Sequence, residues 1–600
     1  MTAGAPITSA PEPELREPIA RQLAGALLVY LVLAFAFTSS AWQDPTNRWI
    51  GNCCDQEQTI WFLAWTPHAI ATGQNPLLTD RLNAPDGANL MWNAAEPLVG
   101  LLAAPVTAIG GPVLAYNVAA VGAIALSGLA AFAVLRRFVR GGLGPLVGGA
   151  LYELSPYVAS HAALHLNLLS AWAPPLFLIL FDELVRRQRV RPWKLGAAAG
   201  LVGAAQLLTS EEILATSAVA ITVLAAVAAL VVRDRAAVAS GFQRLVRAAP
   251  AALVTFLALG GGPLAIQFLG PDRIQGSVTN SAVYSTDLLN VVVPTPYQLL
   301  APDAATALSS GFSGLFHEAT AYVGLPLLVV VAGFAWLGVA RRANLVALVA
   351  GVMAIVLFTL SLGPQLTIAG TQTGIPMPWW PMDQLPLLEN VVPGRLTLYM
   401  WLAIAVLVAI AVTEATRLPL RMRLTALAAI GAALVFVAPT PAASSTTAIP
   451  TFFRTWSSHG IGAADTVLFA PWFADGAGAA PMLWSAGAGA EPRMVEGYVY
   501  VPGENGRPRF GPENGQIGDI MSKIQDTGTA VVARGGVRRS ALTQLGALDV
   551  ADVVVGPMPH QAEMARFFAD LLGAPPTSVD GVLLWRNVPG LVRQQLGAPG

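Results

Sequence analysis

Apolar runs recur along the first 440 residues of this 600-residue chain, and they restrict its fold more than any other feature. The runs are 16–23 residues long, and a helix of about 20 apolar residues spans the ~30 Å hydrocarbon core of a bilayer. The pattern predicts a polytopic α-helical membrane protein. We expect about eleven spans, at residues 22–40, 113–135, 144–162, 168–184, 195–210, 213–232, 248–268, 319–339, 344–362, 397–415 and 424–440.

Basic residues are concentrated in alternate connections between these runs. Cytoplasmic loops of membrane proteins are the ones enriched in Lys and Arg. With the N-terminus inside, the inner segments before residue 440 hold 19 Lys and Arg residues and the outer loops hold four. The bias assigns residues 96–111 to a short interfacial or re-entrant helix on the outer surface, because a span there would move every later arginine cluster outside. Residues 1–21 are then a cytoplasmic tail, and 22–440 are the transmembrane domain.

The predicted location is the inner (plasma) membrane of a bacterial cell. The polar, acidic start and the absence of a small-residue cleavage site favour a retained first span over a signal peptide. Frequent Ala, Gly, Val, Leu and Arg with very little Lys is typical of a GC-rich bacterial genome. The net charge of −1 gives no indication of nucleic-acid binding. The adjacent Cys53 and Cys54 lack the spacing of a metal site or a disulfide framework.

A change of composition near residue 440 predicts a second domain. We expect a soluble domain at 441–600 that begins with a flexible linker at 439–448, because residues 449–600 contain no run long enough to span a membrane. Short strand-like runs, DTVLFAPW, TAVVARG, VADVVVGP and GVLLWRNV, alternate with helical patterns, which favours a small α/β or α+β domain. The topology leaves this domain outside the cytoplasm. It lacks a phosphate loop or a nucleophile elbow, so we expect it to cap the membrane part or bind substrate.

Polar side chains gather on the predicted outer face. The long first loop, residues 41–112, contains Asp55 within the stretch GNCCDQEQTIWFLAW. Another loop, 269–318, ends at Glu318, and a third, 363–396, contains Arg395. Loops longer than ~12–15 residues are usually functional or disordered, and the aromatic and proline residues here indicate order. We therefore expect the binding or catalytic site on this face.

Four segments carry a resemblance to a known class: DQEQTIWFLAWTPHAIATGQNPLLTDRLNAPDGANLMW, SPYVASHAALHLNLLSAWAPPLFLILFDEL, YVGLPLL and LPLLENVVPGRLTLYM. The chain resembles the GT-C glycosyltransferases and, within them, the uncharacterised bacterial branch labelled YfhO-like. The resemblance implies transfer of a sugar from a polyprenyl-phosphate carrier on the outer face, with a catalytic acid early in the first outer loop. That pattern usually has a glycine before the aspartate, where this chain has NCCD.

Asp55 is the predicted catalytic base under this resemblance. Attack on an anomeric carbon with a phosphate leaving group needs a carboxylate that takes the proton of the acceptor hydroxyl. Asp55 also stands where a helix N-cap is expected, and the two roles can coexist. Glu211, Glu212 and Glu318 are candidate second acids that position the acceptor. The alternative for these three is a solvated turn or span end.

A donor phosphate at the membrane surface requires a cation, and Arg395 is the first candidate. A guanidinium binds phosphate through two parallel hydrogen bonds, whereas the alternative role is snorkelling at the interface. Arg273 and Arg81 are weaker candidates for the same task. His161 and His165, four residues apart, are further phosphate-binding candidates, with a hydrogen-bonded pair at a helix end as the alternative.

Other ligands are less defined by the sequence. Trp379 and Trp380 are candidates to stack on a sugar ring, or members of an interfacial aromatic belt. No metal site is predicted from two histidines without a placed carboxylate, and a divalent cation stays open as a cofactor. The expected partners are a polyprenyl-phosphate sugar donor, an envelope glycan or lipid acceptor, and the lipid bilayer.

Three functions are compatible with these observations. The first is a polyprenyl-phosphate-sugar-dependent glycosyltransferase of the cell envelope. The second is a transporter or flippase of lipid-linked substrates, which would place ionisable groups in mid-span; the sequence gives few such groups, with Asp182 and Glu183 near an inner end. The third is a non-catalytic envelope assembly protein that acts through its outer domain.

Overall fold

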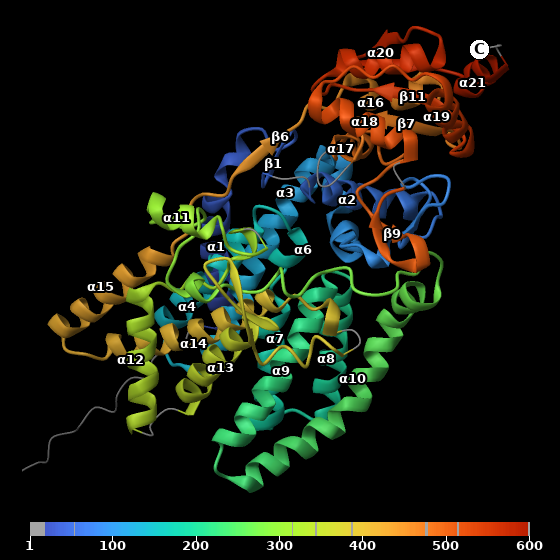
Figure 1. The fold of residues 1–600 in the computed structure, drawn as a ribbon. Coiled ribbons are helices and arrows are strands. Elements are labelled where there is room, and N and C mark those ends of the chain that lie inside the picture. The colour runs from blue at the N-terminus through green and yellow to red at the C-terminus, as the bar shows by residue number, and fades with distance from the viewer. Residues whose placement is uncertain are drawn as a thin grey trace, which may run out of the picture.

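The computed structural model describes residues 18–52, 55–314, 316–341, 345–385, 388–473, 478–512 and 515–597. Within these residues, seven helical stretches are long and apolar enough to cross a membrane. Figure 1 shows a helical part with the C-terminal strands and helices gathered at one end. This is the helical membrane architecture that the apolar runs predict. The seven stretches are α1 (Ile19–Phe37), α3 (Pro97–Phe138), Leu166–Arg187, α9 (Glu211–Val231), α10 (Arg235–Leu269), Pro393–Thr416, which includes α14 (Thr397–Thr416), and α15 (Leu420–Val437).

Four helices inside expected spans are shorter. They are α4 (Leu143–Glu153), α8 (Pro192–Leu207), α12 (Leu325–Arg341) and α13 (Leu345–Ser361), with 11 to 17 residues each. A 17-residue helix is about 26 Å long, slightly less than the ~30 Å hydrocarbon core. The expected span 144–162 is divided, because Ser155 caps a new helix, α5 (Pro156–His161). The count of about eleven spans therefore stays a prediction.

Two of the long stretches contain breaks. The backbone of α3 leaves helical geometry at Gly111, where φ is 83° and ψ is 170°, directly before Pro112. The segment expected as a separate short helix, 96–111, thus meets the following span at a kink. The stretch Leu166–Arg187 consists of α6 (Leu166–Leu169), α7 (Ala173–Asp182) and a π-helical turn, η3 (Glu183–Arg187).

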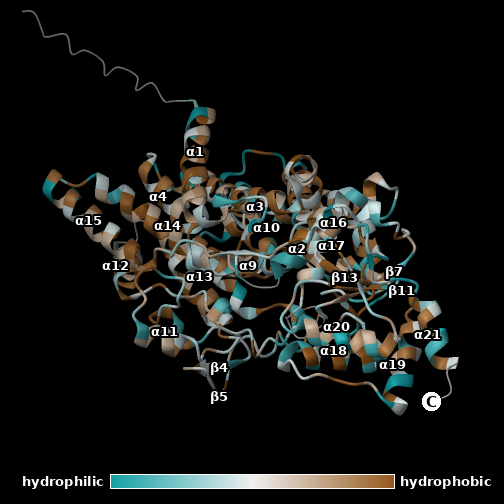
Figure 2. Cartoon of the chain, turned by 90° about the horizontal axis from the view of Figure 1, so that it is seen from above, coloured by the Kyte–Doolittle hydropathy of each residue, from teal (hydrophilic) through white to brown (hydrophobic). Residues whose placement is uncertain are grey.

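Helix α14 lies at the centre of the bundle. Residues 397–413 are all buried, and α14 packs against α3, α4, α12, α13 and α15. Figure 2 shows apolar residues along the helices of this bundle. Because neighbouring helices cover α14 on every side, its first turn is covered as well. Arg395, in the preceding 3-10 turn η7 (Pro393–Leu396), is therefore only 8% exposed.

The C-terminal part is built on a five-stranded sheet with the order β12-β13-β11-β7-β8. The apolar runs 465–472, 550–557 and 581–588 supply β7, β11 and β13, which confirms three predicted strands. TAVVARG (529–535) forms no strand; glycines with positive φ, Gly528 and Gly535, turn the chain on both sides of it. The strands are β7 (Thr466–Ala470), β8 (Arg493–Met494), β11 (Val550–Val555), β12 (Thr577–Val579) and β13 (Val582–Trp585).

Helices cover this sheet and form a second core with it. The amphipathic α20, for example, buries Phe567, Phe568 and Leu571. Pairing of β7 with β8 and β11 is parallel, and β13 runs antiparallel to β11 and β12. The helices are α16 (Thr451–Arg454), α17 (Ala480–Gly487), α18 (Gly515–Thr527), α19 (Gly535–Ala547), α20 (Gln561–Leu572) and α21 (Val588–Gly597).

The linker predicted to be flexible is instead held by a strand pair. Within residues 439–448, β6 (Ser444–Thr446) pairs antiparallel with β1 (Arg48–Ile50) from the first loop. Backbone hydrogen bonds across this pair order the connection and tie the C-terminal part to the loop after α1. The other two-stranded sheets are β2 (Leu78–Thr79) with β3 (Ala88–Asn89), β4 (Gln365–Ile368) with β5 (Thr371–Pro376), and β9 (Tyr500–Pro502) with β10 (Pro508–Phe510).

Candidate functional site

Asp55 begins α2 (Asp55–Ala71), the helix of the long loop between α1 and α3. Its Oδ1 accepts a hydrogen bond from the Tyr498 hydroxyl at 2.8 Å. Its Oδ2 lies 3.1 Å from Nε2 of His165, and 19% of the Asp55 side chain is exposed. The carboxylate that the sequence predicts as a base is thus oriented by two side chains and still accessible.

The position of α2 is fixed from both sides. Nε2 of Gln56 donates to the carbonyl of Ala163 at 2.5 Å, next to the histidine pair. Nε1 of Trp61 donates to Oγ of Ser485 in α17 at 3.0 Å, and Figure 1 shows α17 beside α2. Asp55 therefore lies where the helical bundle meets the C-terminal part.

His161 and His165 form a pair beside Asp55. His161 ends α5 and is fully buried, whereas His165 precedes α6 and is partly exposed. Their Nδ1 atoms are 3.3 Å apart, so one ring donates a proton to the other. This is the hydrogen-bonded pair that the sequence left as an alternative. His165 uses its second nitrogen toward Asp55 and thus connects that carboxylate to the buried ring of His161.

Arg395 faces two carboxylates from different helices. One of its terminal guanidinium nitrogens donates to Oε1 of Glu318 at 2.9 Å, and the other contacts Oε2 of Glu212. The side chains of Arg395 and Glu318 are 10% and 6% exposed, whereas that of Glu212 is 39% exposed. We call Asp55, His165, Glu212, Glu318 and Arg395 the Asp55 cluster.

Burial and mutual charge act on several groups of this region. Burial, and then the negative charge of Asp55, raise the pKa of Glu318 to about 8; the guanidinium of Arg395 is the counterion for its ionised form. Burial, and then His165, lower the pKa of His317. Burial, and then Tyr284 and Asp55, raise the pKa of Tyr500 to about 12. The charge of Asp55 therefore acts on both Glu318 and Tyr500.

Three side chains here form a donor set that fits a divalent cation. His161, His165 and Glu318 each offer a ligand atom, and these atoms lie within 4.8 Å of one another. Nε2 of His161 and Oε2 of Glu318 are buried without a hydrogen-bond partner among the described residues. Two imidazoles and a carboxylate are a known zinc ligand set. A cation bound there would supply positive charge beside Arg395.

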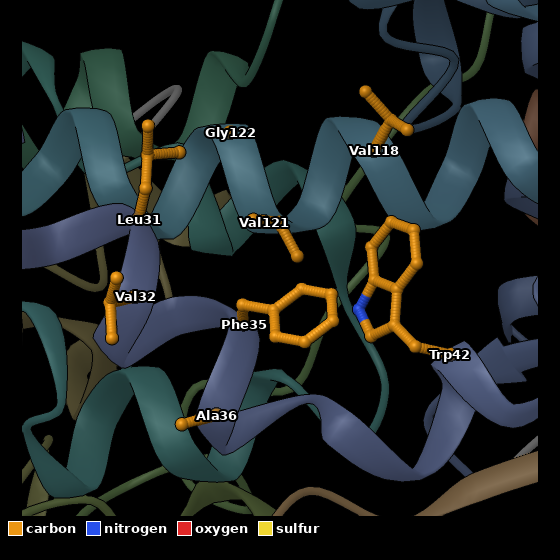
Figure 3. A pocket seen from close by; sticks show the side chains of 8 residues that line it. All are labelled: Leu31, Val32, Phe35, Ala36, Trp42, Val118, Val121 and Gly122. Atoms are coloured by element: carbon orange, nitrogen blue, oxygen red, sulfur yellow. The ribbon is translucent and has the colours of Figure 1, made fainter. Parts of the chain in front are cut away.

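An apolar groove lies between α1 and α3, away from these titratable groups. Its volume is about 550 Å³. In Figure 3 the rings of Phe35 and Trp42 project between the two helices toward Val121. The lining suits a hydrocarbon chain and contains no group that could transfer a proton. The lining residues are Leu31, Val32, Phe35, Ala36, Trp42, Val118, Val121 and Gly122.

The family is shown by a match over most of the chain. A family model described as Domain of unknown function (DUF6311) matches residues 26–437, from α1 to the end of α15. The chain belongs to the DUF6311 family. No curated protein matches it, and the likeness to the YfhO-like branch stays a prediction.

Solved structures similar to this DUF6311 chain are GT-C membrane glycosyltransferases. The arabinofuranosyltransferase AftD from Mycobacteria matches with a TM-score of 0.51 at 15% identity, over 95% of this chain and 40% of AftD. This chain thus spans less than half of AftD's length, and the likeness shows a shared fold. The oligosaccharyltransferase of Archaeoglobus fulgidus matches with TM-score 0.48 at 12% identity, over 92% of this chain and 71% of that enzyme. A complex of the latter with an inhibitory peptide and a dolichol-phosphate gives TM-score 0.45 at 12% identity, over the same shares.

Three predicted candidate residues of the DUF6311 chain lie outside the Asp55 cluster. Glu211 accepts a hydrogen bond from Nε2 of Gln267 at 2.8 Å. Arg273 is exposed, and Arg81 donates to the carbonyl of Ala463. The described contacts do not join these three to Asp55 or Arg395. Their roles in the site stay predictions.

The two adjacent tryptophans differ sharply in exposure. Trp379 is fully buried and Trp380 is 55% exposed. A buried indole has both faces covered by protein, so of the two only Trp380 offers a ring surface in this structure. Sugar stacking by either ring stays a prediction.

Sequence reasoning missed three residues near Asp55. Tyr498 lies 443 positions away in the sequence, and no local pattern links it to Asp55. Tyr500 follows two residues later, at the start of β9 in the C-terminal part. Glu96, at the start of α3, is 3% exposed with φ of 49°, and neither of its carboxylate oxygens has a hydrogen-bond partner among the described residues. The signal available in the sequence was an acidic residue directly before Pro97 and a long apolar run.

Proposed function

We propose that this protein transfers a sugar from a polyprenyl-phosphate donor to a cell-envelope glycan or lipid on the outer face of the plasma membrane. The observation that carries the proposal is the Asp55 cluster. In this cluster Tyr498 and His165 orient the accessible carboxylate of Asp55. The charge of this carboxylate interacts with the buried guanidinium of Arg395. A base and a phosphate-binding cation are the two groups that such a transfer requires.

The reaction assigns one step to each group. The acceptor hydroxyl oxygen attacks the anomeric carbon, while Asp55 takes the hydroxyl proton. The bond between the anomeric carbon and the phosphate oxygen breaks, and polyprenyl phosphate leaves with the electron pair. His165, at 3.1 Å from Oδ2, holds the carboxylate in position. A phosphate leaving group needs no proton from the protein.

Arg395 is the proposed phosphate-binding group, and its two carboxylate partners have different roles. Glu212 is the more exposed partner. Because its carboxylate already contacts water, a phosphate oxygen can replace it beside the guanidinium at a lower cost in free energy. Glu318 is buried and orients the guanidinium through the hydrogen bond that its Oε1 accepts. His161 and His165 complete the polar surroundings, and a divalent cation held by them with Glu318 would add Lewis-acid stabilisation of the leaving phosphate.

The same proposal assigns the parts of the chain. Residues 22–440 form the transmembrane GT-C-like domain, which contains the site. Residues 441–600 form an extracytoplasmic domain. The strand pair β1–β6 and the contact of Tyr498 with Asp55 join the C-terminal part to the loop that holds the base. These contacts support a position of the C-terminal part on the same side of the membrane as that loop.

A transport function is the second candidate, and Glu153 favours it. This glutamate ends α4, is fully buried, and has no hydrogen-bond partner for either carboxylate oxygen among the described residues. A buried carboxyl within a helical bundle is the kind of group that proton-coupled transporters use. Glu153 lies inside the expected span 144–162, and its position in the sequence alone does not distinguish it from a residue at a span end.

Complementation separates the two candidates. A deletion strain receives the wild-type protein, Asp55→Ala or Arg395→Ala, with insertion of each variant checked by membrane fractionation. We expect both variants to lack one envelope sugar linkage that the wild-type protein restores. The glycosyltransferase assignment is wrong if both inserted variants restore the complete set of linkages. Asp44→Ala, an exposed acid in the same loop, is the matched control and should complement.

A further inference from the structure

Four aromatic side chains of the C-terminal part stack beside Asp55. We name Phe473, Tyr498, Tyr500 and Phe510 the aromatic cluster. Phe473 and Tyr498 stack with centroids 4.3 Å apart at 20°. Tyr500 and Phe510, directly opposite each other on β9 and β10, stack at 4.1 Å and 30°. Tyr498 and Phe510, at 5.1 Å, join the two pairs.

The cluster is not closed like an ordinary core. Phe473 is buried, Tyr498 and Tyr500 are partly exposed, and Phe510 is 38% exposed. A short hairpin that only needed a core would gain more by covering Phe510. The exposed fraction of the side chains therefore rises from Phe473 to Phe510, which leaves an aromatic surface open to a ligand.

Hydrogen bonds fix the cluster against the site. The Tyr498 hydroxyl donates to Asp55, and the Tyr498 carbonyl accepts from the side chain of Gln58. The Tyr500 amide donates to Oδ1 of Asn93 at 2.7 Å, and its hydroxyl donates to the carbonyl of Val278 at 3.4 Å. The cluster is thus held by the first loop and by the loop after α10, and one of its members, Tyr498, hydrogen-bonds the candidate base.

We propose that the aromatic cluster binds a sugar ring of the acceptor glycan; this rests on the proposed function. One face of a pyranose or furanose carries C–H groups that pack on aromatic rings, while its hydroxyls stay in reach of polar neighbours. The Tyr498 hydroxyl already donates to Oδ1 of Asp55 as an acceptor hydroxyl must. A sugar stacked on Tyr500 and Phe510 brings its own hydroxyl to that oxygen in place of Tyr498.

The charge distribution favours the acceptor over the donor as the occupant. The donor phosphate requires Arg395, which lies buried at the start of α14. The aromatic cluster belongs to the C-terminal part and is exposed at its far end. An acceptor that approaches from the aqueous side meets Phe510 before it reaches Asp55. The subsite therefore determines which glycan is presented to the base.

Binding measurements on the full-length protein in nanodiscs test this subsite. The probes are methyl glycosides and disaccharides of glucose, mannose, galactose and arabinose, followed by saturation-transfer NMR. We expect at least one probe to bind, and Phe510→Leu to weaken that binding roughly three- to tenfold. Phe510→Tyr should retain it. Phe268→Leu, which changes an exposed phenylalanine at the end of α10, should also retain it.

The outcomes separate this inference from the proposed function. Asp55→Asn should still bind the probes through the aromatic cluster, although the contact of the sugar hydroxyl with residue 55 is altered, and should slow transfer roughly 10²- to 10⁴-fold. If the probes bind through Phe510 but the protein has no transfer activity, the sugar subsite is supported and the glycosyltransferase assignment is wrong. A transferase whose acceptor KM is unchanged by Phe510→Leu overturns the subsite alone. Failure of every probe to bind, or equal loss in Phe268→Leu, also contradicts the subsite.

Discussion

Two charged clusters at opposite ends of α3 are built in different ways. At the C-terminal end of α3, Arg137 contacts Asp182 at 2.7 Å and Glu183 at 2.5 Å. Asp182 also contacts Arg186 and Arg187, and Glu183 accepts the amide of Arg189 at 2.7 Å. Each carboxylate oxygen there has a cationic or N–H partner. We call Arg137, Asp182, Glu183, Arg186 and Arg187 the Asp182 cluster.

The Asp55 cluster has the opposite balance. One arginine, Arg395, faces Glu212 and Glu318, and Asp55 relies on a histidine and a phenol. Oε2 of Glu318 is buried without a hydrogen-bond partner among the described residues. Buried polar atoms in native proteins are normally satisfied. The Asp182 cluster is therefore closed on itself, and we infer that the Asp55 cluster is the one that a ligand completes.

The separation of the clusters matches a bilayer. Tyr116 in α3 hydrogen-bonds Gln56, the neighbour of Asp55. Arg137 follows 21 residues later on the same helix, which corresponds to about 31 Å at ~1.5 Å per residue. The two clusters therefore lie about one hydrocarbon core apart.

Removal of the acid in each cluster should give the largest contrast. We expect Asp55→Asn to lower the rate of sugar transfer roughly 10²- to 10⁴-fold, since that is the usual contribution of a general base. Asp182→Asn should leave its three arginines partly uncompensated and lower thermal stability, while the folded fraction keeps its transfer rate. Transfer assays on purified protein, normalised to the folded fraction, measure both. Equal rates in the two variants would remove the distinction between the clusters.

Replacement of the central arginine by lysine should give the next effect. Lysine keeps the charge but loses the planar pair of donors, and a hydrogen bond between charged groups contributes about 1.5–3 kcal/mol. We expect Arg395→Lys to raise the KM for the donor roughly ten- to hundredfold. Arg137→Lys should change the melting temperature and not the KM. A normal donor KM in Arg395→Lys would argue against phosphate binding.

A pH dependence of stability should distinguish the clusters more weakly. The folded-state pKa of Glu318 is raised to about 8, so between its ordinary pKa and about 8 the native state holds a proton that the unfolded state has lost. The linked stability is full below the unfolded pKa and is lost as pH rises through about 8. We expect the melting temperature to fall between about pH 5 and pH 9, and Glu318→Gln to flatten this fall. Identical slopes in both proteins would show that Glu318 does not titrate in this range.

The smallest effect is expected at Glu153, which belongs to neither cluster. A neutral amide has nearly the shape of a carboxyl group, and Glu153 lies outside both clusters, so Glu153→Gln should transfer sugar at the wild-type rate. Flipping of a fluorescent polyprenyl-phosphate lipid in proteoliposomes should be unchanged as well. Loss of flipping with intact sugar transfer would favour the transport function for this residue.

The sequence predicted the helical architecture and the elements with strong periodicity. Apolar runs locate α1, α9, α10, α14 and α15, because a spanning helix needs a length that few other elements have. It could not settle the span count, since Ser155 and Pro156 divide one expected span and Gly111 bends another. It also expected a flexible linker where β6 pairs with β1, because pairing partners distant in sequence leave no local signal.

The candidate site was predictable in part. His165, Glu212, Glu318 and Arg395 were singled out from their residue types and positions, and Asp55 also from the resemblance to the GT-C glycosyltransferases; the structure brings the five together. Their pairing could not be predicted, because it depends on how α9, α14 and the loops pack. Tyr498 and the aromatic cluster come from a separate part of the chain, and only the tertiary fold brings them to Asp55.

Single-cysteine labelling tests most directly whether the two clusters face opposite sides of the membrane. In a Cys53→Ser, Cys54→Ser background, one cysteine replaces exposed Ala448, beside the Asp55 cluster, and another replaces exposed Arg140, just after α3. A membrane-impermeant maleimide applied to intact spheroplasts should label the cysteine at 448 and spare that at 140, and lysis should expose both. Labelling of position 140 from outside, or protection of 448 until lysis, would place the Asp55 cluster on the cytoplasmic side and contradict the account.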